Sequence, residues 1–151
     1  MAENRIDVFL LERYKYVLSQ KQGLNGATLQ IITIYQTGLA LVVSGQFAIV
    51  AAVVAAKLDP GVARAGSFAL FGLMSVLSTF SLLLLVSGVG AWLGYRREEA
   101  QIEREVFNVS RPAPNLKSAI TWYETYFGIA IIAIYISYVA VLFCAVLPSI
   151  S

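Results

Sequence analysis

Three long runs without a charged residue constrain this chain more than any other feature. Positions 22–56 and 65–95 hold no Asp, Glu, Lys or Arg, and after residue 117 the only one is Glu124. A helix needs about 20 mostly apolar residues to cross a bilayer, and each run is longer than that. Because backbone groups in lipid need partners within their own segment, the runs are expected to be helical. The chain is therefore predicted to be an all-α integral membrane protein.

The predicted transmembrane helices cover residues 28–56, 67–95 and 119–147. The composition agrees, because 58% of residues are hydrophobic and only 13% are charged, about half the charged fraction of a soluble domain. The pieces outside the spans are too short to bury a core of their own. Residues 1–151 are therefore expected to form a single membrane domain.

The positive charges are distributed unevenly between the two sides of these spans. Nine of the 11 Lys and Arg residues lie before the first span or between the second and third spans. The first hairpin holds only Lys57 and Arg64, and the C-terminal tail holds none. Because cytoplasmic loops are enriched in Lys and Arg, the N-terminus is predicted to be cytoplasmic and the C-terminus outside.

The two polar segments on the predicted cytoplasmic side show helical periodicity. Residues 4–22 place apolar side chains at spacings of three, four and seven, which is typical of an amphipathic helix. The cytoplasmic helical loop 96–116 continues the second span, as helix, to about Asn108. These helices are expected either to pack on each other or the headgroups, or to dock a soluble cytoplasmic partner.

Polar residues inside the first span form a stripe. At helical spacing they share one face of the helix, with Gln46 roughly opposite: the stripe consists of Gln30, Thr33, Thr37 and Ser44. Glu124, near the start of the third span, is added to this set because ionisable residues beside a span are functional candidates. One interpretation is that the stripe lines a pore in an oligomer. The other is that it joins helices in an ordinary bundle, with Glu124 an interfacial acid.

Small residues mark expected helix–helix contacts. In the third span they recur at three-four spacing as Ala130, Ala133, Ser137 and Ala140, and in the second span Gly90 and Gly94 form a small-xxx-small pair. Small side chains let helix backbones approach closely in lipid. These faces are expected to pack within the protomer or between copies.

Several function classes lose support from what the sequence lacks. The chain has no histidine and a single cysteine, so the commonest general base and metal ligand is missing. We expect no enzyme activity, no catalytic residue, no cofactor and no metal site. A net charge of +2 is too small to indicate nucleic-acid binding. The expected partners are the lipid bilayer and further copies of the chain.

A short N-terminal pattern carries one resemblance. Glu12-Arg13-Tyr14-Lys15-Tyr16-Val17-Leu18, then Gln20, Leu24-Asn25 and Ile34-Tyr35-Gln36, resemble the opening of small uncharacterised bacterial membrane proteins. Some of these are similar to multi-pass effectors of anti-phage defence systems. The resemblance covers about the first quarter of the chain and assigns no functional residue. It implies a bacterial inner (plasma) membrane protein.

The sequence favours a small homo-oligomeric membrane protein as its leading hypothesis. It would be a channel-like or membrane-perturbing component, gated or recruited through its cytoplasmic helices. The alternative is a non-conducting anchor or scaffold subunit of a larger membrane complex.

Overall fold

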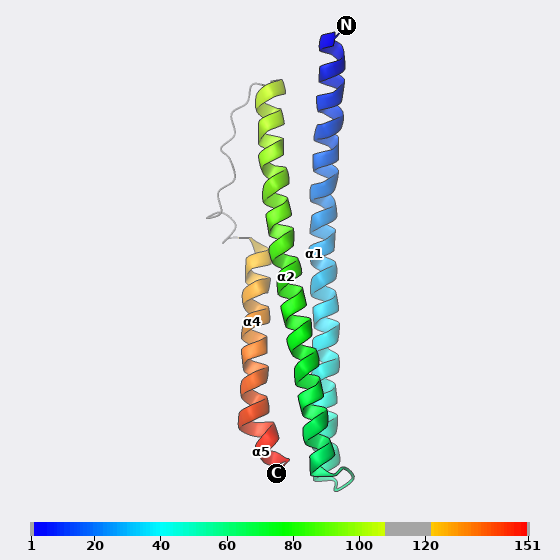
Figure 1. The fold of residues 1–151 in the computed structure, drawn as a ribbon, viewed down its shortest axis with the longest axis vertical. Helices are drawn as coiled ribbons and strands as arrows, with labels where there is room; N and C mark the ends of the chain where they lie inside the picture. The colour runs from blue at the N-terminus through cyan, green and yellow to red at the C-terminus, as the bar shows by residue number, and fades with distance from the viewer. Residues whose placement is uncertain (1, 108–121, 151) are drawn as a thin grey trace. The chain divides into compact units, whose positions relative to one another are not determined.

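The structure, a computed structural model, describes the backbone of residues 2–107 and 122–150. Its elements in chain order are α1 (Ala2–Val54), α2 (Pro60–Phe107), α4 (Tyr123–Val141), a π-helix η1 (Leu142–Val146) and α5 (Leu147–Ser149). Figure 1 labels the four α-helices. Side chains are described for residues 8–105 and 122–150. The predicted loop beyond residue 107 and the first residues of the third span, 119–121, lie outside the described residues.

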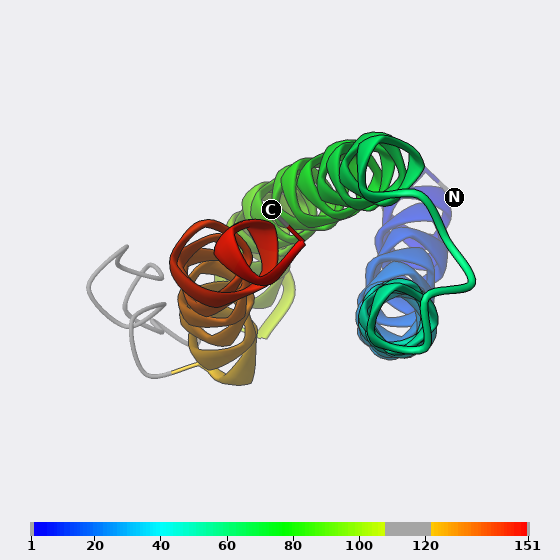
Figure 2. The ribbon, with the colours of Figure 1, turned by 90° about the horizontal axis from the view of Figure 1, so that it is seen from below.

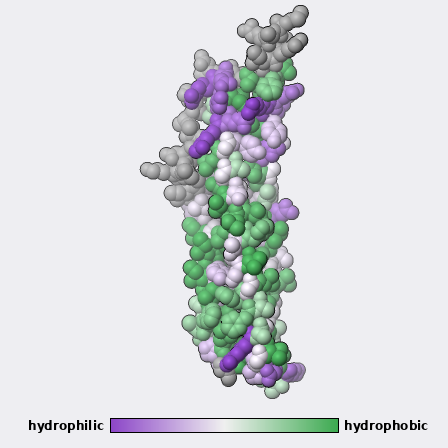
Figure 3. All heavy atoms as spheres, in the orientation of Figure 1, coloured by the Kyte–Doolittle hydropathy of each residue, from purple (hydrophilic) through white to green (hydrophobic). Residues whose placement is uncertain are grey.

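The described chain is entirely helical and contains three helices with the length and apolar composition needed to cross a bilayer. They occupy Val8–Val54, Pro60–Glu105 and Tyr123–Ser149. This confirms the predicted all-α class and three helices of membrane-spanning length and composition. Figure 3 shows hydrophobic side chains covering most of the visible face, whereas hydrophilic ones gather toward its upper end, with a few at the lower end.

The helix α1 runs without interruption from Ala2 to Val54. The predicted amphipathic segment 4–22, the residues 23–27 and most of the first predicted span therefore lie in one helix. Gly23 and Gly26 lie in this region and have no neighbouring atom within 4 Å of an added Cβ. Glycine costs a helix only about 1 kcal/mol, which the packing of α1 on α2 offsets.

The turn between α1 and α2 is capped at both ends. Ala56 has a positive φ of 53°, and the N–H of Lys57 bonds to the carbonyl of Ala52 at 2.9 Å. This is a Schellman-type ending, in which one left-handed residue satisfies the last helix carbonyls. Asp59 Oδ1 then accepts the N–H of Gly61 at 2.7 Å, and Pro60 starts α2. Asp at the N-cap and Pro at the first position are the usual start of a helix.

The contacts divide the chain into two compact units. The first unit comprises Met1–Gln30 and Leu84–Thr125, and the second comprises Ile31–Leu83 and Tyr126–Ser151. In the first unit the N-terminal part of α1 packs on the C-terminal part of α2. Its buried apolar side chains are Val17, Leu85, Leu93 and Ile102.

The second unit joins the rest of α1 and α2 to α4, and Figure 2 shows these helices along their axes. Ser67, Met74 and Ser81 of α2 are buried and lie seven residues apart. Spacing by seven is typical of left-handed helix packing. The facing positions of α1 include two glycines seven residues apart. A Cβ on Gly38 would lie 2.5 Å from a methyl of Leu77, and one on Gly45 would lie 3.2 Å from Leu70.

Aromatic side chains join α4 to α2 in the second unit. Phe71 stacks on Tyr135 with ring centroids 6.4 Å apart and meets Phe143 edge-on at 6.1 Å. The hydroxyls of Ser75 and Tyr135 share a hydrogen bond of 2.9 Å. Such pairs contribute about 0.5–1.5 kcal/mol beyond their burial. These neutral contacts hold α4 and η1 against α2.

Candidate functional site

The predicted polar stripe of α1 lies on the outside of the described helices. All of its members are exposed: Gln30, Thr33, Thr37 and Ser44. The Thr37 hydroxyl donates to the carbonyl of Thr33 at 2.9 Å, within the same helix. The stripe therefore forms an exposed surface of α1 that the other described helices do not cover.

The side of α1 that faces α2 is different. Tyr35 and Val42 are 4% and 0% exposed. Each lies two residues from a stripe residue, and two residues correspond to about 200° around a helix. The stripe and the α2 contact therefore lie on nearly opposite sides of α1.

Gln46 is the buried polar residue that the sequence analysis did not include in the stripe. Its amide nitrogen donates to the Ser67 hydroxyl at 2.8 Å, and its oxygen accepts the Tyr138 hydroxyl at 3.5 Å. Gln46 and Ser67 are 7% and 0% exposed. Gln46 thus connects all three helices of the second unit. The available signal was its position opposite the stripe, which places it toward the other helices.

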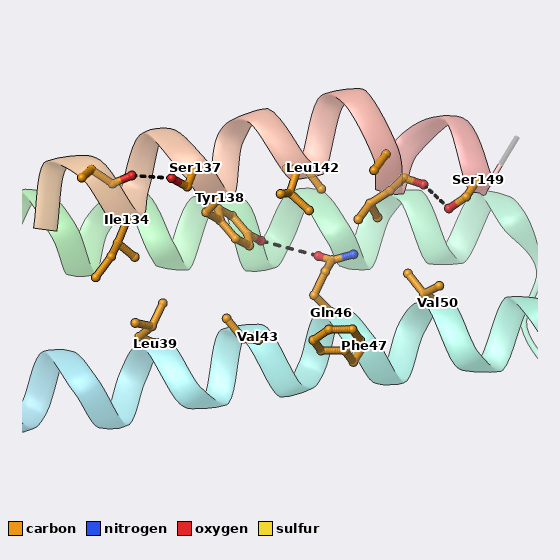
Figure 4. A pocket seen from close by; sticks show the side chains of 14 residues that line it. Leu39, Val43, Gln46, Phe47, Val50, Ile134, Ser137, Tyr138, Leu142 and Ser149 are labelled. Atoms are coloured by element: carbon orange, nitrogen blue, oxygen red, sulfur yellow. Dashed lines mark hydrogen bonds between the residues drawn. The ribbon is translucent and has the colours of Figure 1, made fainter. Parts of the chain in front are cut away.

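An apolar groove opens beside Gln46 in the second unit. Its volume is about 660 Å³, and its walls come from α1 on one side and from α4, η1 and α5 on the other (Figure 4). Leu39, Val43 and Phe47 line the α1 wall. Figure 4 shows the Gln46 side chain extending from α1 toward Tyr138 across the groove. No charged side chain is among the described residues that line it.

The predicted packing residues are not buried between the described helices. Each of the four small residues of α4 is exposed: Ala130, Ala133, Ser137 and Ala140. Ala133 and Ser137 line the groove, and the Ser137 hydroxyl bonds to the Ala133 carbonyl at 2.8 Å. Close packing within the second unit instead uses Gly38 and Gly45 on α1.

The predicted small-xxx-small pair and the predicted acid both lie in the first unit. Gly90 and Gly94 are exposed, and no atom lies within 4 Å of an added Cβ. Glu124 is half-buried in the first turn of α4. The glycines therefore leave an open face on α2.

A charged cluster joins α1 to α2 in the first unit. The ammonium of Lys21 lies 2.8 Å, and Nη1 of Arg96 2.7 Å, from the same oxygen of Glu99, Oε2. Arg13 also pairs with Glu98. The Tyr14 hydroxyl reaches Glu103 Oε1 at 3.5 Å. We refer to Lys21, Arg96, Glu99 and the adjoining Trp92 as the Glu99 cluster.

The charge state of Glu99 follows from these neighbours. Only 4% of the residue is exposed, and burial alone would raise the pKa of its carboxyl. The hydrogen bonds and positive charges of Lys21 and Arg96 act in the other direction, so the pKa of Glu99 is lowered overall. The carboxylate is therefore ionised at neutral pH and holds the two helices together.

In comparisons with known proteins, no family model, curated protein or solved structure matches the chain. The geometry itself defines a class. The described chain is a helical protein with three helices that could span a membrane.

Proposed function

We propose that the protein is the subunit of a homo-oligomeric, channel-like assembly in the bacterial inner membrane, in which the polar stripe of α1 lines a water-filled path. The observation that supports this proposal most directly is the exposure of the whole stripe on the side of α1 away from α2. A single copy has no interior for a path on that side. Symmetric closure of several copies would turn each stripe residue into a ring.

The amide side chains strengthen the argument. Gln30 and Gln36 are exposed on α1, and neither side-chain amide is hydrogen-bonded to another of the described residues. In hydrocarbon a primary amide without a partner is costly, because its donors and acceptor leave water unpaired. Water or a neighbouring copy would satisfy these amides, whereas lipid tails would not.

The proposed orientation places the charged parts of the first unit on the cytoplasmic side of the membrane. Its described residues carry Arg13, Lys15, Lys21 and Arg96 among their cations, and positive charge is retained on the cytoplasmic side. The Glu99 cluster connects α1 and α2 beside the ends of their apolar runs, 22–56 and 65–95. A cytoplasmic partner that binds these ends would act on the spans directly, which is the proposed route of gating or recruitment.

A non-conducting anchor or scaffold is the second candidate, and a different observation favours it. The Thr37 hydroxyl already donates to the Thr33 carbonyl of its own helix. A hydroxyl satisfied in this way needs neither water nor another subunit. In this alternative the exposed faces of α1 and α4 bind other membrane helices.

Ion flux into liposomes tests the proposal. Thr37→Val combined with Ser44→Val keeps side-chain size close to the original but makes the stripe apolar, and a narrow apolar constriction resists wetting. We expect flux to fall by about tenfold or more, since one pore-lining dewetting barrier of about 1.4 kcal/mol already gives a factor of ten. Oligomer size should not change.

The matched control replaces exposed hydroxyls of α2, Thr79→Val with Ser87→Val. This variant removes the same two groups from outside the stripe and should conduct as the wild type does. Equal loss in both variants would contradict a path along α1. Wild-type protein that shows no flux, with or without cytoplasmic extract, would favour the scaffold.

A further inference from the structure

Two cations that border the apolar runs meet in the first unit. Lys21 is the last charge before the run 22–56, and Arg96 is the first charge after the run 65–95. In the structure both contact the same carboxylate oxygen, Glu99 Oε2, at 2.8 and 2.7 Å. Helices that cross a bilayer leave the hydrocarbon where their charges begin. The Glu99 cluster therefore lies at the depth of lipid headgroups.

The cluster carries an excess of positive charge. Two cations share one carboxylate, so one positive charge is not neutralised within it. Glu99 lies beneath, with 5% of its side chain exposed, whereas the Arg96 side chain is 36% exposed. Among the described residues Arg96 bonds through Nη1 only. Because a guanidinium has five N–H donors in a planar fork, several of them have no acceptor within the part of the chain that the structure describes and could bind a further one.

Aromatic rings form the wall beside these cations. The Lys21 ammonium lies 5.4 Å from the centroid of the Trp92 ring, and Cζ of Arg96 lies 5.8 Å from it. Trp122 meets Trp92 edge-on with centroids 4.2 Å apart. Both indoles are half-buried. Tryptophan prefers the headgroup region of a bilayer, and its ring here orients the two cations.

We propose that Lys21, Arg96 and Trp92 form a binding site for the phosphate of an anionic phospholipid headgroup. The phosphate would accept hydrogen bonds from the outward donors of Arg96, as charge-assisted bonds to phosphate do in general. Glu99 beneath it keeps both cations in place and limits the site to one anionic lipid. This site goes beyond the proposed channel and does not depend on conduction, so its test is independent of ion flux.

The chain offers its own reporter of this site. Its two tryptophans are Trp92, which belongs to the Glu99 cluster, and Trp122, which contacts Trp92 edge-on. Full-length protein in vesicles is titrated with brominated phosphatidylglycerol or with brominated phosphatidylcholine, and quenching of tryptophan emission is measured. One unneutralised cation at a membrane surface corresponds to about a fivefold preference for the anionic lipid. Equal quenching by the two lipids would overturn the proposal, and this comparison needs no substitution.

Three variants test which residues produce the preference for the anionic lipid. Arg96→Gln should reduce the preference for the anionic lipid to about onefold. Glu99→Gln leaves both cations without their carboxylate, and it should raise this preference by about a further fivefold. Arg104→Gln is the control, because Arg104 is an exposed cation of α2 two turns farther along. An equal loss in Arg104→Gln would show general surface attraction and overturn the site. Loss of the preference in excess inorganic phosphate at constant ionic strength would assign the site to free phosphate instead.

Discussion

The two units of this protein hold their helices together by different forces. In the first unit α1 and α2 are joined by the ion pairs of Arg13 with Glu98 and of Lys21 with Glu99, of which the second is the more buried. In the second unit the same two helices meet through glycines and through the neutral pair of Gln46 with Ser67.

The difference follows from the medium that each segment is expected to occupy. In lipid, helices associate through close packing and interhelical hydrogen bonds, because apolar burial alone gives no advantage over lipid tails. A charged group there would pay a large desolvation cost. Near water the cost falls, and paired charges then add specificity between helices. One helix pair thus changes its chemistry along its length.

Overpacking the second unit should give the largest effect. Gly38→Leu places a side chain where Leu77 already lies 2.5 Å from an added Cβ. We expect a loss of about 2–3 kcal/mol in the free energy of unfolding, as for other overpacked cores. Gly26→Leu is the control, because no atom lies within 4 Å of its Cβ. Unfolding in detergent mixtures measures both, and equal losses would mean that this contact does not hold the second unit.

Acid should act on the first unit alone. Because the folded pKa of Glu99 is below its ordinary value of 4.5, the stabilisation is complete above that pH and is lost as the pH falls through the lower, folded pKa. Glu99→Gln removes two charged hydrogen bonds at any pH, at a cost of about 2 kcal/mol, and should abolish the acid response.

Emission of Trp92 and Trp122 reports on the first unit during this acid titration, and hydrogen exchange of residues 31–54 reports on the second. Glu105→Gln, an exposed residue that pairs with Gln101, is the matched control and should retain the acid response. If both units open together in acid, the ion pairs of Glu99 do not set the first unit apart from the second.

The neutral pair of the second unit should give the smallest effect. Gln46→Leu removes the bonds to Ser67 and Tyr138, and bonds between helices in lipid contribute about 0.6–2 kcal/mol. We expect a loss of about 1 kcal/mol that does not vary with pH or salt. Gln36→Leu changes an exposed glutamine of the same helix and should leave the stability unchanged. A salt-dependent loss at Gln46 would show that charge contributes there too.

The fold class could be predicted because it depends on local properties. The absence of charge from positions 22–56 and 65–95 is enough to predict helices that cross a membrane. The inward face of each helix depends on its neighbours and was harder to predict. Gln46 faces inward while Thr37 faces outward, yet both are polar residues in one apolar run.

The small residues illustrate the same limit. Ala133 and Gly38 both suit close packing, but only the structure shows that Leu77 approaches Gly38 and that Ala133 is exposed. The continuity of α1 past Gly23 also depends on its partner helix. The Glu99 cluster needed the antiparallel register of α1 and α2, which brings together residues 78 positions apart in the chain.

The π-helix near the C-terminus changes the direction in which the side chains after it point. The N–H of Leu147 bonds to the carbonyl of Leu142, five residues earlier instead of four. Each extra residue in a helical turn rotates everything after it by about 100°. The face that carries Ala133 and Ser137 therefore does not continue in α-helical phase to Ser149. Removing one residue from Leu142–Val146 would restore the α-helical phase up to Ser149.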